Sequence, residues 1–204
     1  MRNIAVLYSG HAAHYRTFTE PKFAQYIQQL IYIRDFDEAM LADVDVLVVP
    51  SQLHLPTFLT IVPAIHRFAD RGGVVVAFGP QPENWIPNQN WELRETNFWW
   101  WLEAGADSGL RLVAPEHPVF KDGFLNIAAC TWHQHGVFHL QDGMTSLIDM
   151  KDGGSLLYVD DVSTNGTWIV TTLDPDFHFG SYFMPATEKF LEGFFPWIAS
   201  GKLV

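Results

Sequence analysis

Three short, predominantly apolar runs near the start of the chain constrain its fold most strongly. They are Ile4–Tyr8, Val44–Val49 and Gly73–Phe78, and serine, proline or glycine follows each of them directly. Short runs of this kind, rich in valine, isoleucine and leucine, are typical of strands that are buried on both faces of a sheet. We therefore expect three buried strands within the first 78 residues.

Amphipathic helices are expected between these strands, because apolar residues recur there at helical spacing. The first helix would follow an N-cap at Thr19, with an apolar face of Phe23, Tyr26, Ile27 and Leu30. The second would end at Gly72, with an apolar face of Phe58, Ile61, Ile65 and Phe68. Pro63 is expected to kink this helix or to delay its start. The alternation predicts an α/β fold: a mostly parallel sheet with helices on both faces and right-handed crossovers.

The second half of the chain is expected to be rich in strands. They are predicted near Leu110–Val113, Trp132–Leu140, Thr145–Asp149, Ser155–Val159 and Thr167–Thr172. A turn is expected at 152–154, and a final helix at Ala186–Ala199, weakened near its end by Pro196. With 204 residues, of which 48% are hydrophobic, the chain suits one domain covering residues 1–204.

Composition excludes several classes of partner. The chain has 12 basic and 23 acidic residues, a net charge of −11, and no basic stripe, so we expect neither nucleic acid nor a membrane surface as partner. No apolar stretch approaches the roughly 18 residues of a membrane helix. The lone cysteine, Cys130, allows no intrachain disulfide. The run Ile4–Tyr8 is too short for a signal peptide, so a cytoplasmic location is expected.

A ligand site is expected where the parallel strands end, because open α/β sheets bind ligands beyond the carboxyl ends of their strands. The loops after the three predicted strands should share this edge, and each carries groups that can form hydrogen bonds. The candidate ligand-binding residues are Ser9, Gly10, His11, Gln52, His54, Gly79 and Gln81.

Histidines are the candidate acid/base groups, because histidine alone titrates near neutral pH without perturbation. We select His117, His135 and His178. If Trp132–Leu140 is a strand, His133, His135 and His139 share one face, and two of them could bind one metal ion. Further ligands could come from Asp160, Asp161, Asp174, Asp176 and His178. The alternative is a polar strand face whose histidines bond to carbonyl groups or aspartates. No glycine-rich phosphate loop is present, and Cys130 is expected to be a buried apolar residue.

Tryptophans offer two interpretations. Trp85 and Trp91, in a loop rich in asparagine and glutamine, could stack on the apolar faces of a sugar, or could simply fill the core. The consecutive Trp99–Trp101, on a short helix predicted at Phe98–Leu102, cannot all face one core. We expect at least one of the three to line a pocket or to meet a second copy of the chain.

The order of these segments resembles the class I glutamine amidotransferase-like superfamily, and within it the ThuA-like branch. The matching segments are Ala5–His11, Asp45–Pro50, Phe68–Val76, His117–Phe120 and Val170–Gly180, followed by the terminal helix and Trp197. The resemblance implies a flavodoxin-like fold and a role connected with sugar utilisation.

The chain departs from this superfamily at the glutaminase triad. Ala77 or Phe78 stands where a working amidotransferase has its cysteine, and Asp174–Asp176 stands in place of the family's late His-Pro-Glu. Glutamine hydrolysis is therefore not expected. The leading interpretation is a ThuA-like protein that binds a small polar ligand, such as a carbohydrate or derivative, without a metal or cofactor. Two alternatives stay open: a non-catalytic homo-oligomeric assembly module, and a metal-dependent hydrolase using His133 and His135. Whether the protein is an enzyme is left open.

Overall fold

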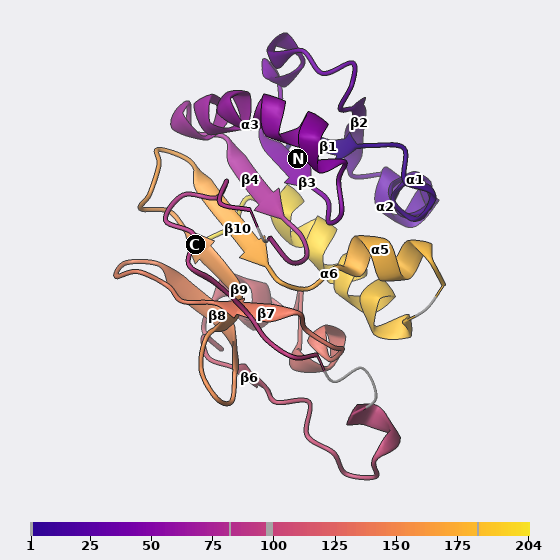
Figure 1. Ribbon diagram of the computed structural model, residues 1–204, viewed down its shortest axis with the longest axis vertical. Helices are drawn as coiled ribbons and strands as arrows, with labels where there is room; N and C mark the ends of the chain where they lie inside the picture. Colours follow the sequence, from indigo (N-terminus) through magenta and orange to yellow (C-terminus); the bar gives the residue numbers. More distant parts are fainter. Residues whose placement is uncertain (1, 82, 97–99, 183) are drawn as a thin grey trace.

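The computed structural model describes residues 2–81, 83–96, 100–182 and 184–204, and its centre is one ten-stranded mixed sheet (Figure 1). Five strands run parallel, in the order β2 (Ile27–Tyr32), β1 (Ile4–Tyr8), β3 (Val46–Val49), β4 (Val74–Ala77) and β10 (Thr167–Thr171). The mostly parallel α/β architecture predicted for the first part of the chain is therefore confirmed.

The rest of the sheet is antiparallel, and most of its strands lie in the second half of the chain, which the sequence predicts to be rich in strands. It consists of β5 (Trp91–Leu93), β6 (Leu110–Leu112), β7 (Gly136–Phe138), β8 (Thr145–Met150) and β9 (Ser155–Asp160). β9 pairs with β10 and continues the sheet to β7 and β5, while β8 pairs with β9 and β6. In Figure 1 these strands fill the lower half of the view.

Helices cover both faces of the sheet. The longer ones are α1 (Ala12–Thr19), α3 (Leu55–Asp70), α5 (Pro175–Gly180) and α6 (Pro185–Ser200). The shorter ones are α2 (Pro21–Ala24), η1 (Glu38–Leu41), η2 (Trp100–Leu102), α4 (Pro118–Lys121) and η3 (Ile127–Cys130). Among the described residues, no helix is both long and apolar enough to cross a membrane.

Alternate residues of the central strands enter two separate apolar clusters, because successive side chains of a strand point to opposite faces. Val48 and Val76 belong to the cluster that contains Phe194 of α6. Leu47 and Val75 belong to the cluster on the other face, which contains the apolar side of α3. The central strands are apolar at every position because both of their faces are buried.

The helix predicted after Thr19 is wrong. Helix α1 ends at that residue, α2 occupies only four residues, and the segment Ile27–Tyr32 is the edge strand β2. Its sequence fits either structure, but only the strand can pair with the free edge of β1. The side chain of Gln28 also accepts a hydrogen bond from the backbone N–H of Ile4, which ties the segment to β1.

Two helices and one strand differ in length from the sequence prediction. Helix α3 begins at Leu55, so Pro63 does not delay its start, and α6 continues past Pro196 to Ser200. The strand predicted at Trp132–Leu140 is confined to Gly136–Phe138. The residues before it leave the strand direction, and the indole of Trp132 lies 3.4 Å from a carboxylate oxygen of Asp174, far along the chain.

Candidate functional site

The carboxyl ends of β1, β3, β4 and β10 lie at one edge of the sheet, because these neighbouring strands are parallel. The sequence predicted this edge for the first three strands. The fourth strand adds the loop that carries Asp174 and Asp176. Gly79 lets the loops close on one another: it has a φ of +80°, and a Cβ there would lie 2.5 Å from the Cβ of Ser51. Its backbone N–H donates to the carbonyl of Leu173 at 2.7 Å.

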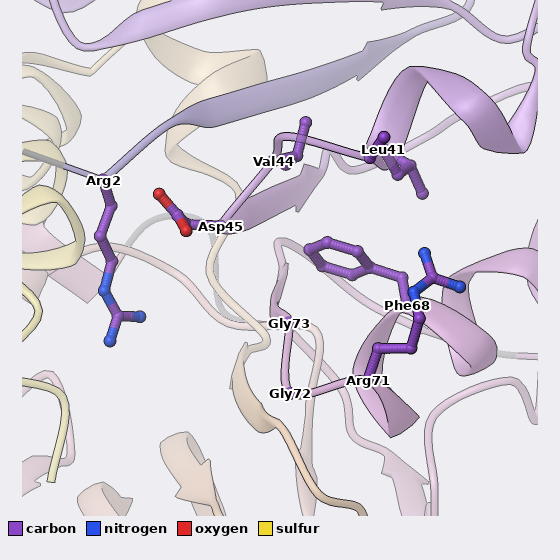
Figure 2. Close-up of a pocket in the computed structure, with 9 residues that line it drawn as sticks. Arg2, Leu41, Val44, Asp45, Phe68, Arg71, Gly72 and Gly73 are labelled. Carbon is purple, nitrogen blue, oxygen red and sulfur yellow. The ribbon is translucent and has the colours of Figure 1, made fainter.

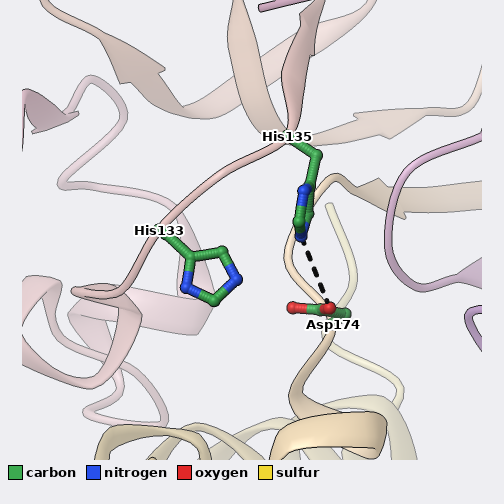
Figure 3. Close-up of side chains that lie close together, drawn as sticks. All are labelled: His133, His135 and Asp174. Carbon is green, nitrogen blue, oxygen red and sulfur yellow. Dashed lines mark ion pairs between the residues drawn. The ribbon is translucent and has the colours of Figure 1, made fainter. Parts of the chain in front are cut away.

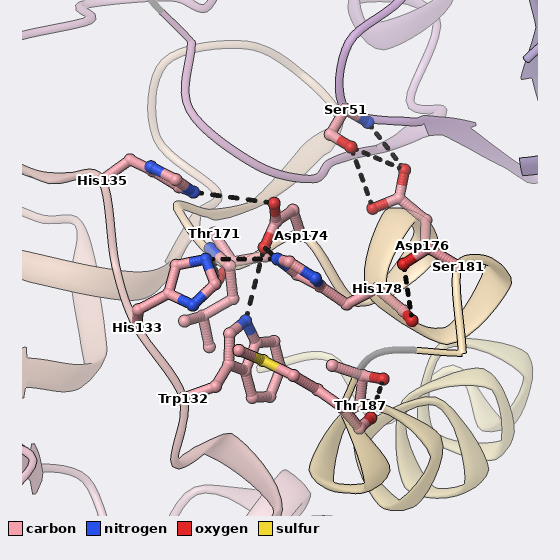
Figure 4. Close-up of polar contacts among 12 residues, drawn as sticks. Ser51, Trp132, His133, His135, Thr171, Asp174, Asp176, His178, Ser181 and Thr187 are labelled. Carbon is pink, nitrogen blue, oxygen red and sulfur yellow. Dashed lines mark hydrogen bonds and ion pairs between the residues drawn. The ribbon is translucent and has the colours of Figure 1, made fainter. Parts of the chain in front are cut away.

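Asp176 joins three of these loops. Its carboxylate accepts hydrogen bonds from the backbone N–H of Ser51 at 2.8 Å and from the Ser51 hydroxyl at 3.0 Å (Figure 4). Nε2 of His14 lies 3.2 Å from the same carboxylate, and both side chains are fully buried. The Thr17 hydroxyl donates to the backbone carbonyl of Asp176 at 2.6 Å. Asp176 therefore acts as a structural anchor between β3, α1 and α5.

Asp174 lies at the centre of a second group of polar side chains, which Figure 4 shows converging on its carboxylate. Oδ1 is 3.3 Å from Nε2 of His178 and 3.4 Å from Nε1 of Trp132, and Oδ2 is 3.7 Å from Nε2 of His135. Burial alone would raise the pKa of the Asp174 carboxyl. The interactions with His135 and His178 outweigh burial and hold this pKa below its ordinary value.

His133 completes this group. Its Nε2 lies 3.2 Å from Nε2 of His178, and its ring centroid is 5.0 Å from that of His135. Burial, with smaller contributions from His178 and His135, lowers the pKa of His133 to about 4 despite the opposing charge of Asp174. Its imidazole is therefore neutral at neutral pH. We call His133, His135, Asp174 and His178 the histidine–aspartate cluster.

A cavity of about 360 Å³ adjoins this cluster, and His135 belongs to both. Its wall combines apolar side chains from the start of α3 with two indoles, Trp85 and Trp91. Polar groups are contributed by Gln52, Gln81 and Glu83. The cavity thus lies at the predicted edge of the sheet and brings together loops from β3 and β4 with residues next to β5 and β7.

The predicted ligand-binding residues divide into two groups. Gln52 and Gln81 line the cavity, and Gly79 packs against Ser51 behind it. The Gln81 amide also stabilises the loop after β4, since it donates to the Phe78 carbonyl and accepts from the Trp85 indole.

The other predicted ligand-binding residues lie outside the cavity lining. Ser9 and Gly10 form the turn after β1, and His11 caps α1 through a hydrogen bond from the backbone N–H of Ala13. His54 is exposed just before α3 and contacts the hydroxyl of Thr57 at 2.8 Å.

Of the three histidines predicted as acid/base groups, His135 and His178 meet in the cluster and His117 does not. His117 is the N-cap of α4, where its Nδ1 accepts from the backbone N–H of Val119. Its Nε2 lies 3.1 Å from the Leu203 carbonyl, and its ring packs against Trp197. The structure thus places His117 away from the cluster, as the cap at the start of α4.

The predicted alignment of His133, His135 and His139 needs correction. His133 and His135 precede β7 in a loop, where they meet Asp174, whereas His139 follows β7. The ring of His139 lies 2.5 Å from the carboxylate of Glu92 at an exposed position. Three partners of the site, Ser51, His14 and Trp132, were not predicted from sequence, although Ser51 and His14 stand in the strand-end loops expected to form it.

Cys130 is fully buried, and burial raises the pKa of its thiol to about 12. At pH 8 only roughly one thiol in ten thousand would be ionised. We expect a disulfide reagent such as DTNB to label the native protein at least about 100-fold more slowly than the urea-unfolded chain, as followed by absorbance. Rapid labelling of native protein would contradict this environment and would reopen the question of a cysteine nucleophile.

A second cavity, of about 280 Å³, lies at the opposite edge of the sheet, near the amino ends of β3 and β4. Figure 2 shows Arg2 and Asp45 on one side of it and Phe68 and Arg71 on the other. Ligands of open α/β sheets bind at the carboxyl edge, so this cavity is not our candidate site.

The sequence predicts that Trp99–Trp101 lines a pocket or contacts a second copy of the chain. Residues 97–99 lie outside the described part of the chain, and Trp100 is half-buried in the short helix η2. Homo-oligomerisation stays a prediction.

No protein-family model matches the chain, and no curated protein matches its sequence. Solved structures do share its fold. A cytoplasmic protein of Salmonella typhimurium is 13% identical, with a TM-score of 0.59 over 97% of this chain and 99% of its own. A protein of Bacteroides uniformis described as ThuA-like is 12% identical, with a TM-score of 0.53 over 95% and 89%. A protein of Thermoplasma acidophilum described as part of GMP synthase is 12% identical, with a TM-score of 0.61 over 98% and 96%. The chain therefore shares the flavodoxin-like α/β fold of these proteins, which the sequence predicted.

Proposed function

We propose that this chain is a ThuA-like protein that binds a small carbohydrate or carbohydrate derivative in the cavity beside His135. The observation that carries the proposal is the lining of this cavity, in which the partly exposed indole of Trp91 stands next to amide, carboxylate and imidazole groups. The second indole of the lining, that of Trp85, is buried against Phe58. Indole faces suit the C–H faces of a sugar ring, while the polar groups suit its hydroxyls. The fold shared with a protein described as ThuA-like supports the same assignment.

The size and place of the cavity support a small ligand. A volume of about 360 Å³ lies in the lower part of the range of roughly 300–1000 Å³ that is usual for small-molecule pockets. The cavity is also at the carboxyl edge of the sheet, where α/β folds bind ligands. We further propose a cytoplasmic location, which the likeness to cytoplasmic proteins of Salmonella typhimurium supports.

The chemistry that we propose for this site is proton transfer by His135. Its side chain is one quarter exposed and lines the cavity, while its Nε2 lies 3.7 Å from the buried carboxylate of Asp174. A carboxylate behind an imidazole orients the ring. Glutamine hydrolysis is not part of the proposal, because β4 is followed by Phe78 and Gly79 and the thiol of Cys130 is buried.

Trp91→Ala is expected to weaken carbohydrate binding at least about tenfold, because one sugar-stacking indole would be lost from the cavity wall. A panel of monosaccharides, disaccharides and their oxidised derivatives would first be screened by thermal shift, and the affinity of any ligand then measured by calorimetry.

Tyr15→Ala is the matched control, since Tyr15 is an aromatic residue 54% exposed outside the cavity lining. Its affinity should equal that of the wild type. The proposal fails if no member of the panel stabilises the protein, or if Trp91→Ala and Tyr15→Ala bind a ligand equally well.

A further inference from the structure

We propose that His133, His135 and Asp174 bind one divalent transition-metal ion, and that zinc suits them best. Figure 3 shows the two imidazoles and the carboxylate gathered around a common point between the loop before β7 and the loop after β10. The proposal goes beyond carbohydrate binding and rests on the positions of the donor atoms. When the ion is bound, His135 is a ligand, so the proton transfer proposed above belongs to the metal-free protein.

The spacing of the donors fits a metal centre. One ligand atom from each residue lies within 4.8 Å of the others, and Nε2 of His135 is 3.7 Å from Oδ2 of Asp174. Bonds of about 2.0–2.2 Å to a tetrahedral zinc ion place neighbouring donors roughly 3.3–3.5 Å apart. The 3.7 Å separation is close to these values, and any wider pair within the 4.8 Å limit would draw together on binding the ion.

His178 is the fourth protein group of the site. Its Nε2 lies 3.2 Å from Nε2 of His133 and 3.3 Å from Oδ1 of Asp174. The His178 imidazole therefore contacts two of the three ligand side chains without being a ligand itself. The Trp132 indole, 3.4 Å from Oδ1, holds the carboxylate from another side. Such outer contacts fix the orientation of ligating side chains and are a usual part of metal sites.

Charge and burial also favour a cation here. Asp174 is only 2% exposed, and within the described residues its ion-pair partners are histidines, with no lysine or arginine among them. A buried carboxylate is costly unless a positive charge compensates it, and a divalent ion can do so while all the imidazoles remain neutral.

The donor set points to a transition metal and away from magnesium or calcium. Imidazole nitrogen suits zinc, copper, iron and nickel, whereas magnesium and calcium prefer sites made of oxygen atoms. Two histidines and one carboxylate are also the donor set of catalytic zinc sites that leave a coordination position open.

The test is titration of the EDTA-treated, dialysed, untagged protein with ZnCl2 by isothermal calorimetry. We expect one Zn²⁺ per chain in the wild type, and at least about 100-fold weaker binding for His135→Ala and for Asp174→Asn. His135→Ala keeps the test valid if Asp174→Asn does not fold, because His135 is partly exposed in a loop. Thermal denaturation of each variant without metal reports its folding.

His139→Ala is the matched control. His139 lies in the same stretch of chain, but its imidazole contacts exposed Glu92 and not Asp174. The control should bind Zn²⁺ as the wild type does, and Mg²⁺ should bind to none of these proteins. The proposal is overturned if the folded wild type takes up no Zn²⁺, or if His135→Ala binds it as tightly as His139→Ala. Neither result would affect the separate assay for carbohydrate.

Discussion

Asp176→Ala is expected to lower the free energy of unfolding by about 3–5 kcal/mol, because it removes one partner from a buried polar group. The fully buried carboxylate accepts from the backbone N–H and the hydroxyl of Ser51 and faces His14. Alanine would leave these groups without their acceptor and without access to water. The loops after β3 and β10 would also lose their common anchor. Urea unfolding followed by tryptophan fluorescence measures the change.

Two control variants separate this network from the mere loss of a surface charge. Ser51→Ala removes one hydroxyl donor but keeps the backbone N–H bond to Asp176, so it should cost about 1 kcal/mol. Asp161→Ala removes an exposed carboxylate and should stay within about 0.5 kcal/mol of the wild type. An Asp176→Ala protein as stable as the Ser51→Ala protein would show that Asp176 does not carry the anchor.

The buried parallel strands could be predicted from sequence because burial on both faces leaves an uninterrupted apolar run. Val46–Val49 and Val74–Ala77 are such runs, and their side chains divide between the two apolar clusters. The edge strand Ile27–Tyr32 carries two glutamines, and its apolar residues also fit a helix. Its structure is decided by pairing with β1, a contact between distant parts of the chain that local spacing does not encode.

The edge of the sheet that holds the site could be predicted from sequence. The sequence could not show which of the polar residues at that edge lie at the centre of the site. The sequence indicates Asp174 and Asp176 as candidate metal ligands. Their position next to the loop after β3 follows only from the parallel pairing of β10 with β4. A strand in the antiparallel half of the sequence gives no local sign of that pairing. His117 shows the reverse case, because the sequence singles out a residue type that can titrate, whereas the structure uses its ring as the N-cap of α4.

Gly193→Ala is expected to destabilise the protein by about 3 kcal/mol, through overpacking. In most helix interiors this substitution stabilises by about 1 kcal/mol, because alanine is the better helix former. Here α6 lies so close to the loop before η3 that a Cβ on Gly193 would stand 1.8 Å from the carbonyl oxygen of Phe124. Neither backbone can yield without displacing a helix whose apolar face fills the core. Urea unfolding by far-UV circular dichroism gives the sign and the size.

Gly105→Ala is the control for Gly193→Ala, because it separates steric conflict from backbone conformation. Gly105 has a φ of +76°, and a Cβ there would meet nothing within 4 Å. Gly105→Ala should lower the free energy of unfolding by about 1–2 kcal/mol, because alanine disfavours the left-handed conformation. Gly193 lies within a regular helix and carries no such conformational cost, so any loss there comes from the contact with Phe124. A Gly193→Ala protein as stable as the wild type would mean that α6 is not held this closely. The distance between α6 and the Phe124 backbone would then have to be larger than in the structure.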